Sequence, residues 1–267
     1  MKNLTVLLLL AVLVSCATSP TGRNRLILVG DQQINQMGAA SFQELKSAEK
    51  ISRDRRTNRY VQCISNAIID QLPGPWRQTP WEVVVFEDES ANAFALPGGK
   101  IGVNTGLLTV AETADQLATV IGHEVAHVMS KHGAERVSIQ LAAQTGLQVV
   151  DVMSRQHVEG STERKMLMTG LGLGTQVGVL LPFSRTHESE ADEVGLQLMA
   201  LAGFDPRSSI TLWENMSRAH GGQRAPEFLA THPNPSNRIK HLSGLMQTAI
   251  ATQQQAAARG LNPQCAY

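Results

Sequence analysis

The stretch TVIGHEVAHVMSKHG, residues 119–133, decides how the rest of this 267-residue sequence is interpreted. Apolar side chains surround its polar ones, so we predict a largely buried helix over residues 113–132. His123 and His127 are four positions apart, about 40° round that helix and one turn along it, so both imidazoles can reach one metal ion. Glu124 lies to one side of the pair, where it can act on a metal-bound water as a general base.

A His-Glu-x-x-His pattern also arises by chance, in roughly one chain in a hundred of this length. Such a chance match would face solvent. Here the flanking residues are apolar, and two histidines and a glutamate without partners would be costly to bury. We therefore favour a metal site. His132, nine positions after His123, is predicted to face the opposite side of the same helix and not to bind the metal.

A catalytic zinc ion needs a third protein ligand and an open position. The acidic run SRTHESEAD, residues 184–192, places Glu188 and Asp192 on one helical face, whereas Glu190 points about 200° away from Glu188. We predict Glu188 as the third ligand and Asp192 as the acceptor that fixes the tautomer of a ligating histidine. Taken alone, this run would be a solvated acidic helix start. His187 is expected to be exposed.

The chain begins with the features of an exported lipoprotein. Residues 1–15 contain a lysine and a short apolar run, which predicts a signal peptide. The sequence LVSC resembles a lipobox, so we predict that Cys16 is lipidated and starts the mature chain; cleavage after Ala17 is the alternative. The polar residues 16–30 are predicted to be a tether. In a Gram-negative cell, the alanine after the cysteine resembles outer-membrane sorting.

The remaining sequence predicts an α+β fold that is mainly helical, with a small antiparallel or mixed β-sheet. We assign residues 31–250 to one domain and residues 251–267 to a C-terminal tail. Strands are expected within residues 81–87 and 92–106, which are bounded by turn residues. Apolar residues at helical spacing predict helices over residues 31–50, 59–72, 113–132, 137–154, 163–182, 186–202, 206–219 and 235–254.

Two classes of ligand are excluded. Lysine plus arginine and aspartate plus glutamate each number 23, so no basic surplus favours nucleic acid. The glycine-rich residues 170–175 have Thr175 where the third glycine of a dinucleotide fingerprint belongs, and no Gly-Lys follows, so nucleotide binding is not expected. The surrounding apolar segment, residues 166–183, contains too many glycine and polar residues to favour a spanning helix.

Setting Cys16 aside leaves Cys63 and Cys265, an even pair in an exported protein. A disulfide between them would fasten the polar, alanine-rich tail. The alternative is a buried free Cys63 and an unattached Cys265, and the sequence does not distinguish the two.

Four blocks of sequence, in this order, resemble the zinc metallopeptidases related to HtpX, Oma and the CAAX prenyl protease, and within them the periplasmic branch of BepA and LoiP. The resemblance covers about residues 20–245. The blocks are NAFALPGGKIGVNTGLL (92–108), GHEVAH (122–127), SRTHESEAD (184–192) and THPNPSNRI (231–239).

The resemblance implies a zincin-type fold with one zinc ion held by His123, His127 and Glu188, and Glu124 as base and acid. It implies an envelope endopeptidase that hydrolyses misfolded or unassembled exported proteins, with outer-membrane proteins as natural substrates. The alternative is a metal-stabilised lipoprotein that binds or chaperones its clients without cutting them. An extended substrate is expected to pair by β-augmentation with one strand of the enzyme. The residues of that strand are Asn92, Ala93, Phe94, Ala95 and Leu96. The alternative interpretation is that this segment is an ordinary hairpin that binds no substrate.

The loop that contains THPNPSNRI has two prolines within four residues, which stiffen it. The resemblance makes this loop part of the site. His232 at its start is predicted either to occupy the fourth zinc position as a gate or to donate to the oxyanion with Arg238 nearby. A histidine that only caps local backbone is the third interpretation.

Overall fold

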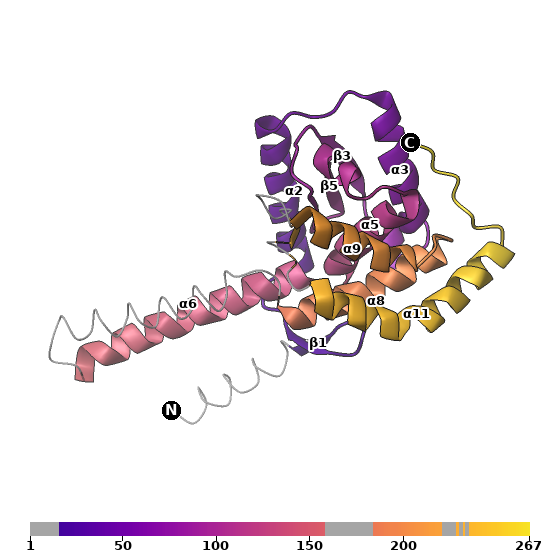
Figure 1. The fold of residues 1–267 in the computed structure, drawn as a ribbon. Coiled ribbons are helices and arrows are strands. Elements are labelled where there is room, and N and C mark those ends of the chain that lie inside the picture. Colours follow the sequence, from indigo (N-terminus) through magenta and orange to yellow (C-terminus); the bar gives the residue numbers. More distant parts are fainter. Residues whose placement is uncertain (1–15, 158–183, 221–227, 230–231, 233–234) are drawn as a thin grey trace.

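Helices make up most of the chain, and a small sheet packs among those of its first half, which confirms the predicted α+β fold (Figure 1). The computed structural model describes residues 16–157, 184–220, 228–229, 232 and 235–267. Its elements are β1 (Cys16–Thr18), β2 (Asn24–Leu26), α2 (Asp31–Ala48), α3 (Arg55–Ile69), α4 (Gly74–Arg77), β3 (Glu82–Phe86), β4 (Ala93–Leu96), β5 (Lys100–Asn104), the 3-10 helix η1 (Thr105–Thr109), α5 (Ala114–Met129), α6 (His132–His157), α8 (Arg185–Leu201), α9 (Ser208–His220) and α11 (Pro235–Ala258).

Helix α5, which contains the His-Glu-x-x-His motif, lies at the centre of the core. Every residue from Gln116 to Met129 is buried, against α3, α8, α9 and β4. The helix starts at a capped end, where the Thr113 hydroxyl accepts a hydrogen bond of 3.2 Å from the backbone N–H of Gln116. The motif therefore does not face solvent, as a chance match on a surface helix would.

The helix predicted over residues 113–132 is in fact two helices. It ends at Met129, and Lys131 follows with a φ of 53°, in the left-handed region that a side chain rarely adopts. Helix α6 then begins at His132 in a new direction and extends away from the other helices (Figure 1). The prediction that His132 lies opposite His123 is therefore wrong, because it assumed one continuous helical rotation.

Helices α5 and α8 cross where each has a glycine, Gly122 and Gly195. A Cβ atom added at Gly195 would lie 2.8 Å from the backbone nitrogen of His123, and one at Gly122 would lie 2.8 Å from the Gly195 carbonyl oxygen. Neither helix can carry a larger residue there without shifting. This contact brings the histidine pair of α5 close to the acidic residues of α8.

The sheet is mixed, with strand order β3-β5-β4. Strand β3 runs parallel to β5, and β4 runs antiparallel to it, with Ala95 opposite Ile101. The turn between β4 and β5 uses Gly98 and Gly99, whose φ angles are 85° and 74°. Because β4 is at the edge of the sheet, no other strand of the described residues pairs with its second side.

The N-terminal segment differs from the predicted tether. Strands β1 and β2 form an antiparallel hairpin in which Cys16 pairs with Leu26. Ser19 and Arg25 are buried, and Val29 packs with Ile34 in a small second cluster. The polar composition suggested a solvated segment, but its arginines find buried acceptors on the domain.

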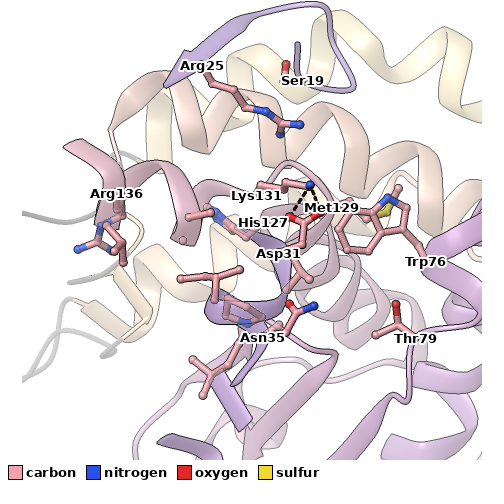
Figure 2. Close-up of a pocket in the computed structure, with 18 of the residues that line it drawn as sticks. Ser19, Arg25, Asp31, Asn35, Trp76, Thr79, His127, Met129, Lys131 and Arg136 are labelled. Carbon is pink, nitrogen blue, oxygen red and sulfur yellow. Dashed lines mark hydrogen bonds and ion pairs between the residues drawn. The ribbon is translucent and has the colours of Figure 1, made fainter. Parts of the chain in front are cut away.

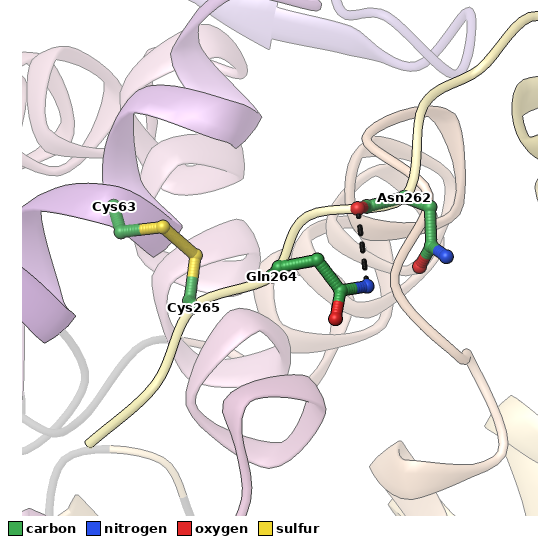
Figure 3. The surroundings of a disulfide bond; sticks show 4 residues. All are labelled: Cys63, Asn262, Gln264 and Cys265. Atoms are coloured by element: carbon green, nitrogen blue, oxygen red, sulfur yellow. Dashed lines mark hydrogen bonds between the residues drawn. A yellow bond between two sulfur atoms is a disulfide. The ribbon is translucent and has the colours of Figure 1, made fainter.

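The C-terminal tail is fastened to α3 by a disulfide between Cys63 and Cys265, whose Cα atoms are 5.7 Å apart (Figure 3). Next to it, the Tyr267 ring packs edge-on against Tyr60, with centroids 5.0 Å apart. The bridge joins residues 202 positions apart. A cross-link closing so long a loop restricts the unfolded chain, which contributes about 5 kcal/mol of stability in the chain-entropy account.

Two predicted segments, the signal peptide over residues 1–15 and the helix over residues 163–182, lie outside the described residues. Among the helices of the described part, none combines the length and the apolar character that crossing a membrane requires.

Candidate metal centre

Three elements bring four potential metal ligands together. His123 and His127 come from α5, Glu188 from the first turn of α8, and His232 from the loop before α11. One donor atom from each lies within 4.8 Å of all the others. Each residue is only 3% exposed. His123, His127 and Glu188, the predicted ligands, are therefore placed to bind one ion.

The spacing of the donor atoms suits a small tetrahedral ion. Bonds of about 2.0–2.1 Å to a tetrahedral zinc put neighbouring ligand atoms about 3.3 Å apart. Here the two Nε2 atoms of His123 and His127 are 3.0 Å apart, and each is 3.4 Å from a Glu188 carboxylate oxygen. Two imidazole nitrogens and one carboxylate are donors that zinc and neighbouring transition metals accept.

His232 completes this set. Its Nδ1 atom is 3.2 Å from His123 Nε2 and 3.0 Å from Glu188 Oε1. The imidazole stacks on Phe228, with ring centroids 4.4 Å apart. Nδ1 therefore lies among the ligand atoms, where a fourth ligand would be.

Glu124 lies beside the ligand set and touches the sheet. Its Oε2 accepts a hydrogen bond of 3.2 Å from the backbone N–H of Ala95 on β4, and its Oε1 is 3.4 Å from His232 Nε2. Burial raises the pKa of the Glu124 carboxyl. A carboxylate with a raised pKa is better suited to take up a proton and to return it later.

Asp192 and Arg238 hold the other side of the centre. Asp192 Oδ1 is 3.2 Å from Nδ1 of His123, the nitrogen that faces away from the ligand set. Arg238 donates to Asp192 Oδ2 and to Glu188 Oε2, both at 2.8 Å, and its guanidinium lies 3.8 Å from the Trp213 ring centroid. A terminal nitrogen of Arg238 also lies 2.8 Å from His123 Nδ1. These contacts engage Arg238 with two carboxylates and one histidine, so the geometry favours an orienting role over donation to an oxyanion.

The charge state of Glu188 follows from its neighbours. Burial alone would favour the neutral acid, but hydrogen bonds with His123, His127 and His232 lower the pKa of the Glu188 carboxyl well below its usual range. The carboxylate is therefore ionised, as a metal ligand must be.

The far nitrogen of His127 has a partner that sequence reasoning missed. His127 Nδ1 is 2.9 Å from Nδ1 of His132, whose Nε2 is 3.0 Å from Glu190 Oε2. Burial lowers the pKa of His132 to about 4, so its imidazole is neutral. The turn residues Ser130 and Gly133 around Lys131 were the available signal that the helix ends before His132.

His187 is buried rather than exposed as predicted. It is 5% exposed, its Nε2 is 3.0 Å from Glu135 Oε2, and its ring stacks on His132 with centroids 4.4 Å apart. The first turn of α8 faces α6 and the N-terminal hairpin here. A helix start rich in polar residues looks solvated in the sequence, but long-range packing buries this one in a second polar cluster.

A cleft of about 800 Å³ begins at His127 and the end of β4 (Figure 2). Trp76 and Met129 contribute apolar surface to it, and the ion pair between Asp31 and Lys131, with a 2.6 Å contact, lies at its border. The cleft is therefore next to both the metal ligands and the sheet edge, and it is large enough for several side chains of a peptide.

Comparison with known proteins agrees with this site. Residues 55–246 match Peptidase family M48. The mitochondrial metalloendopeptidase OMA1 of Bos taurus is 32% identical over 244 residues, covering 86% of this chain and 46% of the relative. OMA1 of Schizosaccharomyces pombe is 38% identical over 163 residues, which cover 61% of this chain and 45% of the relative. The beta-barrel assembly-enhancing protease of Escherichia coli is 28% identical over 206 residues, which cover 76% of this chain and 42% of the relative. The chain spans less than half the length of these relatives.

Proposed function

Because the chain belongs to Peptidase family M48, we propose that it is a zinc-dependent endopeptidase of the bacterial cell envelope. The observation that carries this proposal is the position of Glu124, buried beside the three-ligand set and bonded to the sheet edge. A group in that place can exchange protons with a water molecule and with a peptide held against β4. A purely structural metal site has no need of it.

The chain's own residues supply the proton transfers. A bound zinc ion supplies Lewis-acid chemistry, which makes water more acidic and stabilises negative charge on a carbonyl oxygen. Glu124 takes a proton from the attacking water and then gives a proton to the leaving amine. Arg238 and Asp192 keep Glu188 and His123 in position throughout.

Strand β4 supports binding of an extended substrate. The Asn92 carbonyl accepts a hydrogen bond from the Asn104 N–H on β5, whereas the Ala95 N–H donates to Glu124 on the other side of the strand. Backbone groups alternate along a strand, so Ala93 and Ala95 present theirs on the unpaired side. A peptide paired there would be held by backbone hydrogen bonds with little sequence preference, and its side chains would enter the apolar cleft at Trp76.

Misfolded or unassembled envelope proteins are the substrates that this arrangement fits, since they expose extended backbone. One relative is named a beta-barrel assembly-enhancing protease, which supports outer-membrane proteins among them. The LVSC sequence supports anchoring through lipid on Cys16, and the Cys63–Cys265 disulfide suits an oxidising compartment such as the periplasm. A binding or chaperone lipoprotein is the second candidate, because a metal-clamped fold can hold a client without cutting it.

Metal analysis and casein cleavage test these functions together. We expect protein extracted from envelope membranes to contain one zinc ion per chain, to carry an acylated Cys16 by mass, and to degrade unfolded casein. A chelator should abolish cleavage, and added zinc should restore it. Stoichiometric zinc without cleavage of casein or unfolded outer-membrane protein would support the binding role. Absence of bound metal would contradict both functions.

His232 is proposed to be a gate that closes the resting site. Its Nδ1 competes for the fourth ligand position, so His232→Ala is expected to raise casein cleavage several-fold while zinc content stays unchanged. His241→Ala is the control, because His241 lies on the following helix and contacts only the Ser189 carbonyl among the described contacts. A fall in turnover by orders of magnitude with zinc retained would instead assign His232 to the oxyanion. Wild-type rates in both variants would exclude either role.

A further inference from the structure

The two histidine ligands differ in what holds their far nitrogens. For His123 the neighbours are the Asp192 carboxylate on α8, at 3.2 Å, and a terminal nitrogen of Arg238, at 2.8 Å. For His127 the neighbour is another imidazole, His132, which in turn contacts Glu190. This second arrangement takes no part in the proton transfers proposed for Glu124.

Hydrogen-bond chemistry allows one consistent assignment along this second series. His127 must leave the lone pair of Nε2 for the metal, so its hydrogen is on Nδ1 and is donated to Nδ1 of His132. A neutral His132 that accepts through Nδ1 carries its own hydrogen on Nε2 and donates it to Glu190 Oε2. We call the series Glu190–His132–His127 the relay. It orients the ligating imidazole and fixes its tautomer.

The outer end of the relay is held by the N-terminal hairpin. Thr21 donates to Glu190 Oε1 at 2.7 Å, and the Nε of Arg23 donates to Glu190 Oε2 at 3.0 Å. The two terminal nitrogens of Arg23 donate to the carboxylate of Glu135 at 2.7 and 2.6 Å. Both Thr21 and Arg23 lie in the loop between β1 and β2, so the hairpin fixes the carboxylate on which the relay ends.

Burying this cluster is expensive. His132 is 0% exposed and Glu190 4%, and a buried carboxylate is costly unless its charge is compensated, as Arg23 compensates that of Glu190. Apolar residues of similar size would stabilise the same position with less desolvation. The polar residues therefore point to a role at the metal centre in addition to packing.

We propose that Arg23 and Thr21 are positioning residues for the metal ligand His127, acting through Glu190 and His132, so that docking of the N-terminal hairpin sets the metal affinity. This inference rests on the proposed metal centre. It adds the N-terminal hairpin, which is remote from the metal ligands in sequence, to the residues that determine metal affinity. Changes in the outer partners of metal-binding histidines typically alter affinity by about 10–100-fold.

Zinc dissociation constants, measured on the full mature chain by competition with a chromogenic chelator, test the relay. Arg23→Gln is expected to raise the dissociation constant about tenfold, and His132→Phe by about 10–100-fold. His132→Gln, which keeps an acceptor and a donor, should recover much of the loss. Arg25→Gln is the matched control: Arg25 is in the same hairpin and donates to the Ser130 carbonyl, outside the relay.

A double-mutant cycle distinguishes transmission from general loosening. If Arg23 acts through His132, Arg23→Gln should have no further effect on zinc affinity in the His132→Phe background. The visible spectrum of the Co²⁺-substituted protein should change in Arg23→Gln, because the ligand geometry relaxes, whereas it should stay unchanged in Arg25→Gln. Additive losses in the cycle, or equal losses in Arg23→Gln and Arg25→Gln, would overturn the relay.

The outcomes separate this inference from the proposed function. If the wild-type protein binds no zinc, the metal centre itself is wrong. If wild type binds zinc and both Arg23→Gln and Thr21→Val bind it equally tightly, only the relay is wrong. The folding of every metal-free variant is checked by circular dichroism. If His132→Phe does not fold, the two hairpin variants still decide whether the relay affects zinc affinity.

Discussion

Glu124→Gln is expected to lower casein cleavage by about 10²–10⁴-fold while one zinc ion per chain stays bound. Glutamine has nearly the same shape, and its amide oxygen can keep the hydrogen bond from Ala95 N–H. It cannot take a proton from water, however. Because the site is buried, no solvent base can replace the lost carboxylate.

The measurement is initial rate against zinc content in the same preparation, compared with wild type. Glu214→Gln, an exposed substitution of the same kind on α9, is the control and should change neither quantity. A Glu124→Gln protein that keeps more than about a tenth of the wild-type rate would assign the base to another group, since general acid–base catalysis contributes at least about a hundredfold.

Glu188→Ala is expected to lose stoichiometric zinc and, with it, measurable cleavage. The donors that remain are His123, His127 and the displaceable His232, so only two fixed ligands hold the ion, one fewer than a catalytic zinc site uses. The change also leaves Arg238 without one of its buried acceptors. Elemental analysis of dialysed protein, with circular dichroism to check folding, measures this outcome.

Glu190→Ala is the comparison for Glu188→Ala, and the structure predicts a different effect for it than the sequence does. The sequence places Glu190 away from the metal and predicts a mild effect. In the structure Glu190 is buried and accepts hydrogen bonds from Thr21, Arg23 and His132. Its removal should keep zinc stoichiometric at saturating concentration but cost roughly 1–3 kcal/mol of folding stability. Metal retained in Glu188→Ala and lost in Glu190→Ala would reverse the ligand assignment.

The parts of the site that follow from local geometry were predictable. His123 and His127 share one helical face because they are four residues apart, and the same spacing relates Glu188 to Asp192. Apolar periodicity likewise predicted most helices, with ends displaced by a few residues. These features depend only on rotation along a helix that does form.

The remaining features depend on contacts between distant segments. His132 reaches His127 because Lys131 adopts a left-handed conformation. Ser130 and Gly133 indicate that a helix ends here, but a lysine does not indicate that conformation. Arg23 lies 167 positions from Glu190, and no pattern in either segment predicts that the two residues are in contact. The parallel pairing of β3 with β5 is also long-range, since the chain forms β4 between them and β4 then takes the edge.

The crossing of α5 and α8 at Gly122 and Gly195 also bears on which ions the centre accepts. At that crossing the main chain of one helix touches the main chain of the other, so the distance from the histidine pair to Glu188 is set by backbone contact. Side chains can change rotamer, but these backbones cannot separate without disturbing the core. Calcium prefers six to eight oxygen ligands at about 2.3–2.6 Å. The glycine contact therefore keeps the ligand atoms at a spacing that suits a small ion with few ligands, and it disfavours Ca²⁺, which needs longer bonds and more oxygen ligands.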